Sequence, residues 1–594
     1  MTSRAEKRRR MFLATTALED FWDTSHQIVF LTEACCRYSR RDYLRSLCSS
    51  IFRSSLEDAE RQDKLFLHLS QIYESSLKSL ASSLSLLHDT EKGIRYWRVL
   101  VGPWLMFYVN AFYDRFTSLV EAFDRYPDLT SILLNEDCYV TPTDTLHFVE
   151  LMKGDFYNLQ LYSAIMRLMG KQFDSRRVTT SVKDIEANMP RQPSGQSTIG
   201  KIINSLGNLR RDNIVIDYYS SYFPKSALMA MFVKSGFSIS PGFYNPVSID
   251  GNGVDLSMRR RLETMLLEKS TDLFSQAMYS VLAGQIPKVF LENYQTLLKV
   301  VDKGHFPRTG NILIGHSLYF NESLKEWAGE ISETGGRLLG CQHGGVYGTS
   351  AYTVAESHET EISDVYYTWG WEKDRCRARV KAMPAPNLIA ATRSRPSARP
   401  GRALFLATSL PRYVNELPRK WGQQEQYFQW QLRFFRELEP MVRSSFRIRP
   451  HKEEVGWDVI QRMADAFPEV SIETWDIPFW ESVQSSRLVV CDHNSTTFLQ
   501  TIAAGIPTVL FWPPDLNKMR PDAIVSFDRL REVGILHFSP DDAASLVNLI
   551  YESSDEWWCE SKRQEVVDEF RQKYANSMKG GVDRWIQQLR SEMS

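Results

Sequence analysis

Short apolar runs alternate with amphipathic helical patterns over most of the chain. In the first half, these runs predict buried strands at 213–219, 311–317, 337–343 and 364–370. A second series predicts further strands at 402–409, 445–451, 470–475, 487–493 and 507–512. Alternation of buried strands with helices is typical of parallel sheets covered on both faces. The pattern therefore predicts an α/β protein with two Rossmann-type domains in series.

The stretch from about residue 44 to residue 200 follows a helical pattern instead. Apolar residues there recur at spacings of three and four, as in LFLHLSQIYESSLKSLASSLSLL, which predicts long helices. One buried strand is predicted before it, in QIVFLTEAC at 27–35. The helical stretch ends in the polar, Pro- and Ser-rich segment 187–200, which is typical of a loop or boundary. We therefore predict a large helical insertion in the N-terminal half.

The chain is long enough to need more than one core, because 594 residues exceed the size at which a single core stops growing. The aperiodic segment 386–401, rich in Pro, Arg and Ser, predicts a linker. We therefore place an N-terminal Rossmann-like domain at 1–385. A C-terminal Rossmann-like domain follows at 402–594 and ends in helices.

Composition and charge narrow the class of partner. The chain is 43% apolar and 24% charged, with a formal net charge of −1, so no charge excess favours nucleic acid. The eight Cys form no CxxC array, which favours a reducing, cytoplasmic setting. Acids and Trp22 interrupt the apolar part of the N-terminus before it reaches the length of a signal peptide or a membrane span, so we expect neither. The basic cluster at 7–10 leaves open a peripheral contact with anionic lipid at the inner membrane.

Several catalytic motifs are absent from the sequence. It contains no HExxH and no GxSxG, so zinc protease and α/β-hydrolase functions lack their motifs. The segment GQSTIGKI at 195–202 departs from a P-loop, because Ile202 lacks the hydroxyl that would hold magnesium. No array of metal ligands is visible either. We therefore expect chemistry that needs no metal and no cofactor.

In open α/β sheets ligands bind beyond the carboxyl ends of the strands. The predicted strand 445–451 ends in Arg449 and His451, side chains that can bind a phosphate by charge-assisted hydrogen bonds. The loop after strand 402–409 adds Arg412, for which reaching the same phosphate and lying at the surface are equally good hypotheses. A loop of this charge also commonly just faces water.

A polar turn and a helix start follow the predicted strand 487–493. The residues there are Asn494, Ser495, Thr496 and Thr497, and the first three are suited to cap a helix. Backbone N–H groups and hydroxyls at such a helix start can also bind an anion, such as the phosphate of a nucleotide. Together with the Arg and His loop of the same domain, this turn favours a donor phosphate site.

The segment QHGG places Gln342 and His343 at the end of the predicted strand 337–343. Gly344 and Gly345 follow and allow a ligand or another backbone to come close. A His at such a strand end can act as a general base near neutral pH, although a hydrogen-bonded structural role is also common. Downstream acids, Glu359 among them, could assist His343 or be the base themselves.

Five stretches of the sequence carry a resemblance to a known family. They are FLATTALEDFWDTSHQIVFLTEACCRYSRR (12–41), WRVLVGPWL (97–105), QHGGVYG (342–348), EISDVYYTWGW (361–371) and NSTTFLQTIAAGIPTVLFW (494–512). They resemble a family of bacterial transferases associated with surface-carbohydrate loci, notably those for nonulosonic, sialic-acid-like sugars. More distantly, the C-terminal pattern looks like glycosyltransferases of the GT-B fold with capsule and sialyl-type chemistry.

The resemblance implies an architecture and a donor site. GT-B enzymes have two Rossmann-type domains that face a cleft, so residues 1–385 would form the acceptor side and residues 402–594 the nucleotide-donor side. In the sialyl-type enzymes a His-Pro dipeptide and a Ser/Thr-rich helix start bind the phosphate of a CMP-sugar. The resemblance thus implies that His451 and the Ser495–Thr497 segment hold that phosphate, although this chain reads Pro-His rather than His-Pro.

Residues and resemblance together predict a metal-independent glycosyltransferase of surface-polysaccharide or lipopolysaccharide synthesis. The expected donor is a nucleotide-activated sugar, such as a CMP-linked nonulosonate, and the acceptor is a hydroxyl of a glycan or protein. His343 or Glu359 would deprotonate the acceptor, and Gln342, Gly344 and Gly345 would lie on the acceptor side. Two alternatives stay open: a CDP-alcohol phosphotransferase or UDP-sugar epimerase on the same fold, and a non-catalytic nucleotide- or carbohydrate-binding scaffold.

Overall fold

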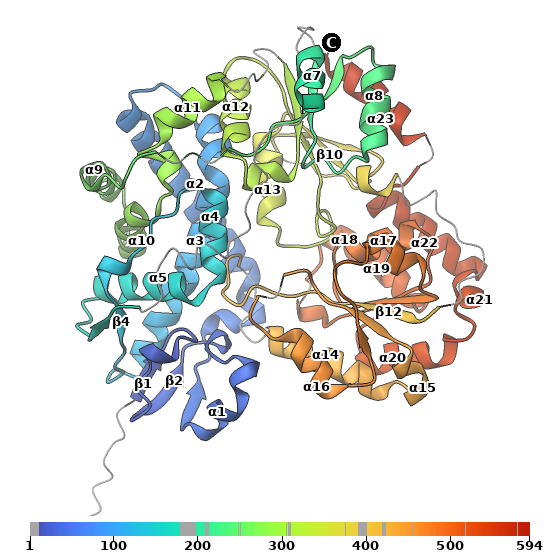
Figure 1. Cartoon of the computed structure of the whole chain (residues 1–594), viewed down its shortest axis with the longest axis horizontal. Coiled ribbons are helices and arrows are strands. Elements are labelled where there is room, and N and C mark those ends of the chain that lie inside the picture. The colour runs from blue at the N-terminus through green and yellow to red at the C-terminus, as the bar shows by residue number, and fades with distance from the viewer. Residues whose placement is uncertain are drawn as a thin grey trace, which may run out of the picture.

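A computed structural model describes the chain at residues 11–178, 198–207, 213–247, 249, 251–303, 306, 310–374, 376–389, 401–417, 423–453, 455–516, 518–578 and 580–593. Within these ranges the strands form two six-stranded sheets, a three-stranded sheet and a two-stranded sheet. Figure 1 shows a helical unit on the left, the first large sheet at the top and the second at the lower right. The basic cluster at 7–10 and most of the predicted linker 386–401 lie outside the described residues.

The first large sheet runs in the order β11-β10-β9-β8-β6-β7, with all neighbours parallel. Its first strand in the chain, β6, lies between the second and the third, which is a common order of doubly wound sheets. β6, β9 and β10 are buried along their whole length, as expected for parallel strands covered on both faces. The strands are β6 (Ile214–Asp217), β7 (Ile239–Gly242), β8 (Asn311–Ile314), β9 (Leu338–Cys341), β10 (Val365–Thr368) and β11 (Arg379–Ala382). Its helices are α7 (Thr198–Gly207), α8 (Lys225–Lys234), α11 (Tyr294–Lys303), α12 (Glu322–Glu333) and α13 (Val354–Ile362).

The second large sheet runs in the order β14-β13-β12-β15-β16-β17, again all parallel. In chain order this is 3-2-1-4-5-6, the order of the dinucleotide-binding Rossmann fold. The strands are β12 (Ala403–Leu406), β13 (Arg447–Arg449), β14 (Ser471–Ile472), β15 (Leu488–Cys491), β16 (Thr508–Phe511) and β17 (Leu536–His537). Its helices are α14 (Gln423–Glu437), α15 (Pro440–Ser444), α16 (Val459–Ala466), α17 (Phe479–Gln484), α18 (Thr496–Ala503), α19 (Pro521–Glu532), α20 (Pro540–Ile550), α21 (Ser554–Trp558) and α22 (Ser561–Tyr574). The two sheets confirm the prediction of two Rossmann-type domains.

The helical unit is assembled from two separate parts of the chain. α2 (Gln62–His88), α3 (Ile94–Arg125), α4 (Thr145–Lys153) and α5 (Asp155–Leu168) precede the first large sheet. α9 (Leu256–Leu267) and α10 (Leu273–Gln285) come from the connection between β7 and β8 and pack against α2 and α5. The mostly helical character predicted for this region is therefore confirmed, and α9 and α10 complete it.

A small parallel sheet of β1 (Met11–Ala14), β2 (Gln27–Phe30) and β3 (Ser49–Ile51) packs on this unit. It shares one core with the helices, so the strand predicted at 27–35 pairs outside the two Rossmann sheets. A short helix, α1 (Arg41–Ser46), joins β2 to β3, and β4 (Leu133–Leu134) pairs with β5 (Ser175–Arg176).

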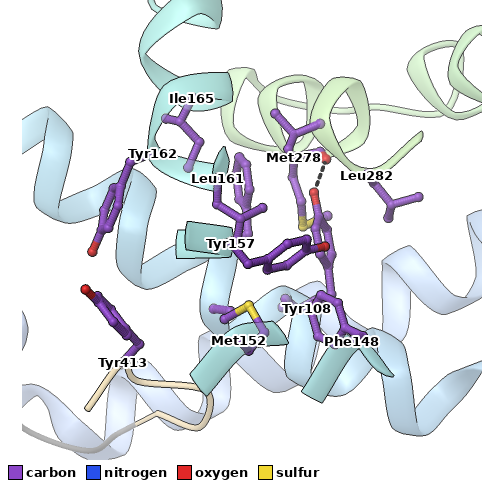
Figure 2. Close-up of a cluster of buried hydrophobic side chains, with 14 of the residues drawn as sticks. Tyr108, Phe148, Met152, Tyr157, Leu161, Tyr162, Ile165, Met278, Leu282 and Tyr413 are labelled. Carbon is purple, nitrogen blue, oxygen red and sulfur yellow. Dashed lines mark hydrogen bonds between the residues drawn. The ribbon is translucent and has the colours of Figure 1, made fainter. Parts of the chain in front are cut away.

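The core of the helical unit is rich in tyrosine, as Figure 2 shows. The Tyr108 hydroxyl on α3 donates to the Met278 carbonyl of α10 at 2.9 Å. Tyr413, 1% exposed, enters this core from the loop after β12 and points toward Tyr162. A segment of the second Rossmann domain is thus part of the helical core.

The last helix, α23 (Gly581–Met593), crosses back to the first large sheet and lies beside α8 (Figure 1). Trp585 is buried there against Phe223 and Tyr367. Glu592 pairs with Arg337, which directly precedes β9, and with Arg379 and Lys381 of β11. None of the described helices combines the length and apolarity needed to cross a bilayer.

Candidate functional site

A cavity of about 680 Å³ lies where the two Rossmann sheets and the helical unit meet. Histidines that follow three strands line it: His316 after β8, His343 after β9 and His493 after β15. β8 and β15 flank the points at which the strand order of the two sheets reverses, β6/β8 and β12/β15, which is where ligands bind in open α/β sheets. The volume is within the usual range of small-molecule sites.

His343 is held by a carboxylate behind it. Its Nε2 lies 2.8 Å from Oε1 of Glu359 on α13 and 2.9 Å from the Tyr347 hydroxyl. Because a carboxylate accepts hydrogen bonds, this contact places the ring proton on Nε2 and leaves Nδ1 as the acceptor nitrogen. His343 therefore has the tautomer that a general base acting through Nδ1 requires.

Glu359 is 2% exposed and accepts hydrogen bonds from three tyrosines as well as from His343. The donors are Tyr319 at 2.7 Å, Tyr347 at 2.8 Å and Tyr366 at 2.8 Å. Burial alone would raise the pKa of Glu359, but His343 and these hydroxyls outweigh it and hold the pKa below its ordinary value. Glu359 is thus a charged group that positions His343, and it does not line the cavity.

His316 lies beside His343, with ring centroids 5.1 Å apart. Burial, with a smaller contribution from His343, lowers the pKa of His316 to about 4. The ring is therefore neutral near pH 7 and can exchange hydrogen bonds with a bound hydroxyl but carries no charge.

The QHGG segment is hydrogen-bonded to Trp369 and Trp371 on one side and packs directly on α18 on the other. The Gln342 side-chain oxygen accepts from the Trp369 backbone N–H at 2.8 Å and from Trp371 Nε1 at 2.7 Å. Gln342 itself is 1% exposed and away from the cavity, whereas Gly344 lines it. The Gly345 N–H donates to the Thr496 hydroxyl at 2.9 Å, so this segment connects the two Rossmann domains.

The start of α18 faces the cavity with its polar side chains. Ser495 is the N-cap and accepts from the Thr497 backbone N–H. Ser495 and Asn494 line the cavity, and the Asn494 amide donates to the Thr349 hydroxyl at 3.1 Å. Thr496 contacts Gly345 instead, and Thr497 lies 3.2 Å from His493 Nε2. The predicted helix start is therefore present, and Asn494 and Ser495 are its cavity-facing members.

Three side chains predicted to hold phosphate are placed elsewhere. Arg412 is 3% exposed and its guanidinium pairs with Asp155 at the start of α5. Arg449 is 4% exposed and pairs with Glu473 at 3.1 Å. His451 is exposed, and its Nδ1 accepts from the Glu453 backbone N–H at 3.2 Å. None of these three lines the cavity, and each arginine is paired with a carboxylate, so the phosphate role predicted for them stays a prediction.

Sequence reasoning missed part of the site. His316 and His493 were within predicted strands but not selected, although each stands at the same offset after its strand as His343 does. The helical unit also contributes a wall of the cavity. The residues of this wall include Phe107, Leu146, Val149 and Lys153. No local sequence pattern links these helix positions to the strand ends.

A family model matches the sequence over residues 11–589, that of the LIC12162 family transferases. The chain belongs to this family. No curated protein sequence matches the chain. Family membership confirms the predicted transferase class.

Solved structures similar to this family member are distant. The wall teichoic acid polymerase TagF is 11% identical, with 66% of this chain and 92% of that chain covered and a TM-score of 0.32. The UDP-GlcNAc 2-epimerase from Neisseria meningitidis is 11% identical, with coverages of 64% and 99% and a TM-score of 0.36. The glycosyltransferase SnogD from Streptomyces nogalater is 11% identical, with coverages of 64% and 99% and a TM-score of 0.33.

Proposed function

We propose that the protein is a glycosyltransferase that moves a sugar from a nucleotide-activated donor to a hydroxyl acceptor. One observation carries the proposal: a histidine oriented by a buried carboxylate and a polar helix start line the same cavity, one from each Rossmann domain. A transfer from a sugar phosphate to a hydroxyl needs a base for the acceptor and a site for the departing phosphate. His343 supplies the first and the start of α18 the second.

The acceptor hydroxyl is bound near His343 and gives up its proton to Nδ1 as its oxygen attacks the anomeric carbon. Glu359 keeps the proton of the resting imidazole on Nε2 and stabilises the imidazolium that forms. The Ser495 hydroxyl and the first N–H groups of α18 bind the departing phosphate. The resemblance of the sequence favours a CMP-linked nonulosonate as donor and a glycan or protein as acceptor. Independence from metal belongs to the same proposal.

The nucleotide class can be tested by thermal unfolding of the purified protein with CMP, CDP, UDP, GDP and dTDP. A ligand that binds only the folded state raises the unfolding temperature. We expect selective stabilisation by CMP. Stabilisation by CDP alone would move the proposal to transfer of an alcohol phosphate, and no response to any of the five would contradict a nucleotide-dependent transferase.

The base can be tested by His343→Ala, with His451→Ala as the matched control. We expect His343→Ala to lower turnover by about 10²- to 10⁴-fold, the usual contribution of general acid–base catalysis. The nucleotide should raise the unfolding temperature of His343→Ala as much as that of wild type, because the His343 ring is not part of the phosphate site. Lost nucleotide binding with turnover retained would place His343 on the donor side instead.

A further inference from the structure

A second histidine oriented by a carboxylate faces the cavity from the other Rossmann domain. His493 Nδ1 lies 2.8 Å from Asp492 Oδ1, and its Nε2 lies 3.2 Å from the Thr497 hydroxyl in the first turn of α18. His493 lines the cavity and its side chain is 11% exposed. The ring thus stands at the helix start that the proposed function assigns to the donor phosphate.

The orientation of this ring is fixed by a chain of hydrogen bonds. Asp492 is 2% exposed and also accepts from the Tyr427 hydroxyl at 2.6 Å and from the Gln431 amide at 2.6 Å. Both of these donors are on α14 and are themselves buried. Because Asp492 accepts from Nδ1–H, the other nitrogen is directed to α18 and the cavity. Packing of the second domain therefore sets which atom of His493 meets a ligand.

A further polar atom at this site has no partner. Asn494 is 6% exposed and lines the cavity, and its side-chain oxygen forms no hydrogen bond with any described residue. Buried polar atoms in native proteins are nearly always hydrogen-bonded. An acceptor left open beside His493 is therefore suited to a ligand that carries donors, such as the hydroxyls of a sugar or ribose.

We propose that His493, positioned by Asp492, is the residue that binds the phosphate of the donor and donates a proton to it. The proposal rests on the proposed function and assigns to His493 the role that the resemblance implies for His451. His451 is exposed and outside the cavity, whereas His493 lines it next to Ser495 and Asn494. The two histidines occupy the same offset after β13 and β15 of one sheet.

The step conserves atoms and charge. His493 enters the step as the imidazolium, with one proton on Nδ1 facing Asp492 and a second on Nε2. When the bond from the anomeric carbon to the phosphate oxygen breaks, its electron pair goes to that oxygen, and the Nε2 proton is transferred to it, which leaves His493 neutral. The acceptor oxygen forms the new bond to the anomeric carbon, and its proton goes to His343 Nδ1. One histidine on each wall thus gains or loses a proton, and neither needs a metal or redox partner.

The test is isothermal titration of the wild-type protein and two variants with CMP and with UDP. His493→Gln keeps a neutral donor near the Nε2 position, whereas His493→Asn keeps only a group near Nδ1. We expect the affinity for the bound nucleotide to fall about tenfold in His493→Gln and further in His493→Asn, because charge-assisted hydrogen bonds are stronger than neutral ones. Turnover should fall by about 10²-fold or more in both variants.

His451→Gln is the matched control and should keep nucleotide affinity within about twofold of wild type. Wild-type protein that binds a nucleotide while both His493 variants bind it equally well would overturn this assignment alone. If nucleotide affinity were lost in His451→Gln and retained in both His493 variants, the phosphate-binding role would belong to His451. Wild-type protein that binds none of CMP, CDP, UDP, GDP and dTDP would overturn the proposed function and this assignment with it.

Discussion

At the scale of single residues, Glu359 shows how a buried carboxylate can control a histidine without touching a ligand. Its two oxygens receive four hydrogen bonds, from His343 and from three tyrosines. A carboxylate in this position can only accept, so the His343 proton has one possible place. The hypothesis from the sequence that Glu359 is itself the base is not supported by this geometry, because Glu359 does not line the cavity.

The first prediction follows from that constraint. Glu359→Gln introduces an amide that can donate to His343 Nε2 and so favours the tautomer with the proton on Nδ1. We expect turnover to fall on the order of 10³-fold or more with little change in KM, since the wrong tautomer cannot accept the proton of the acceptor. The measurement is steady-state transfer with the donor identified by the nucleotide screen.

Tyr366→Phe is the control for Glu359→Gln. It removes one hydrogen bond to the far oxygen of Glu359, typically worth about 1 kcal/mol, and leaves the contact with His343 in place. Turnover in this variant should stay within about tenfold of wild type. If Glu359→Gln lost no more activity than Tyr366→Phe, orientation of His343 would not be the role of Glu359.

The residue scale also shows what the sequence could reveal. His316, His343, His451 and His493 each stand two positions after the last residue of a parallel strand. The rule that ligands bind beyond the carboxyl ends of strands selects all four equally. Only the fold separates them, because His316, His343 and His493 line the cavity while the loop after β13 reaches it with Glu453 and not with His451.

At the scale of elements, the contact between QHGG and the start of α18 is one place where the two Rossmann domains meet. A Cβ at Gly345 would lie 2.4 Å from the carbonyl carbon of Ser495 and 2.4 Å from the Thr496 nitrogen. Both are backbone atoms, which cannot rotate aside as a side chain can. Glycine is required here so that the base and the phosphate site can lie in one cavity.

The second prediction concerns Gly345→Ala. We expect it to lower the free energy of unfolding by about 1–3 kcal/mol, as overpacking does, and to weaken nucleotide binding because α18 must shift. Gly284→Ala on α10 is the matched control, since a Cβ there meets no atom within 4 Å, and alanine favours a helix by up to about 1 kcal/mol. Thermal unfolding with and without CMP measures both effects. If Gly345→Ala and Gly284→Ala had equal unfolding temperatures with and without CMP, the close contact at Gly345 would not be needed for stability or nucleotide binding.

Edge strands explain which elements the sequence pattern missed. Every predicted strand is present. The strands that were not predicted are each at an edge of a sheet, namely β1, β3, β4, β5, β7, β11 and β17. An edge strand does not need the continuous apolar run that identifies a central parallel strand. β7 even contains Pro241, a residue that central strands exclude but edge strands tolerate.

At the scale of the whole molecule, long-range contacts tie the three units together. Arg412, in the loop after β12, pairs with Asp155 of the helical unit, and Tyr413 donates to the same carboxylate at 2.5 Å. Such a contact joins residues 257 positions apart, so no local pattern could predict it. The sequence therefore predicted the two sheets well and the attachment of the helical unit to the second sheet not at all.

The C-terminal helix makes the opposite connection, from the second domain to the first. Burial alone would raise the pKa of Glu592, but Lys381, Arg379 and Arg337 outweigh it and hold the pKa below its ordinary value. Glu592 thus stays charged and paired near pH 7. Trp585 supplies the apolar part of the contact, since it is 1% exposed and donates from Nε1 to the Pro384 carbonyl at 2.8 Å.

The third prediction is that Trp585→Ala releases α23 from the first sheet. Loss of a buried Trp typically costs about 3–5 kcal/mol, here concentrated where α23 meets Phe223 and Tyr367. We expect limited proteolysis to cut between α22 and α23 in the variant but not in wild type, and calorimetry to show an earlier transition. Leu549→Ala, at a side chain 80% exposed on α20, is the control and should change neither the cleavage pattern nor the calorimetric transition. A variant that stayed resistant to cleavage would mean that the Glu592 ion pairs and the other buried side chains of α23, Ile586 and Leu589, hold it in place without Trp585.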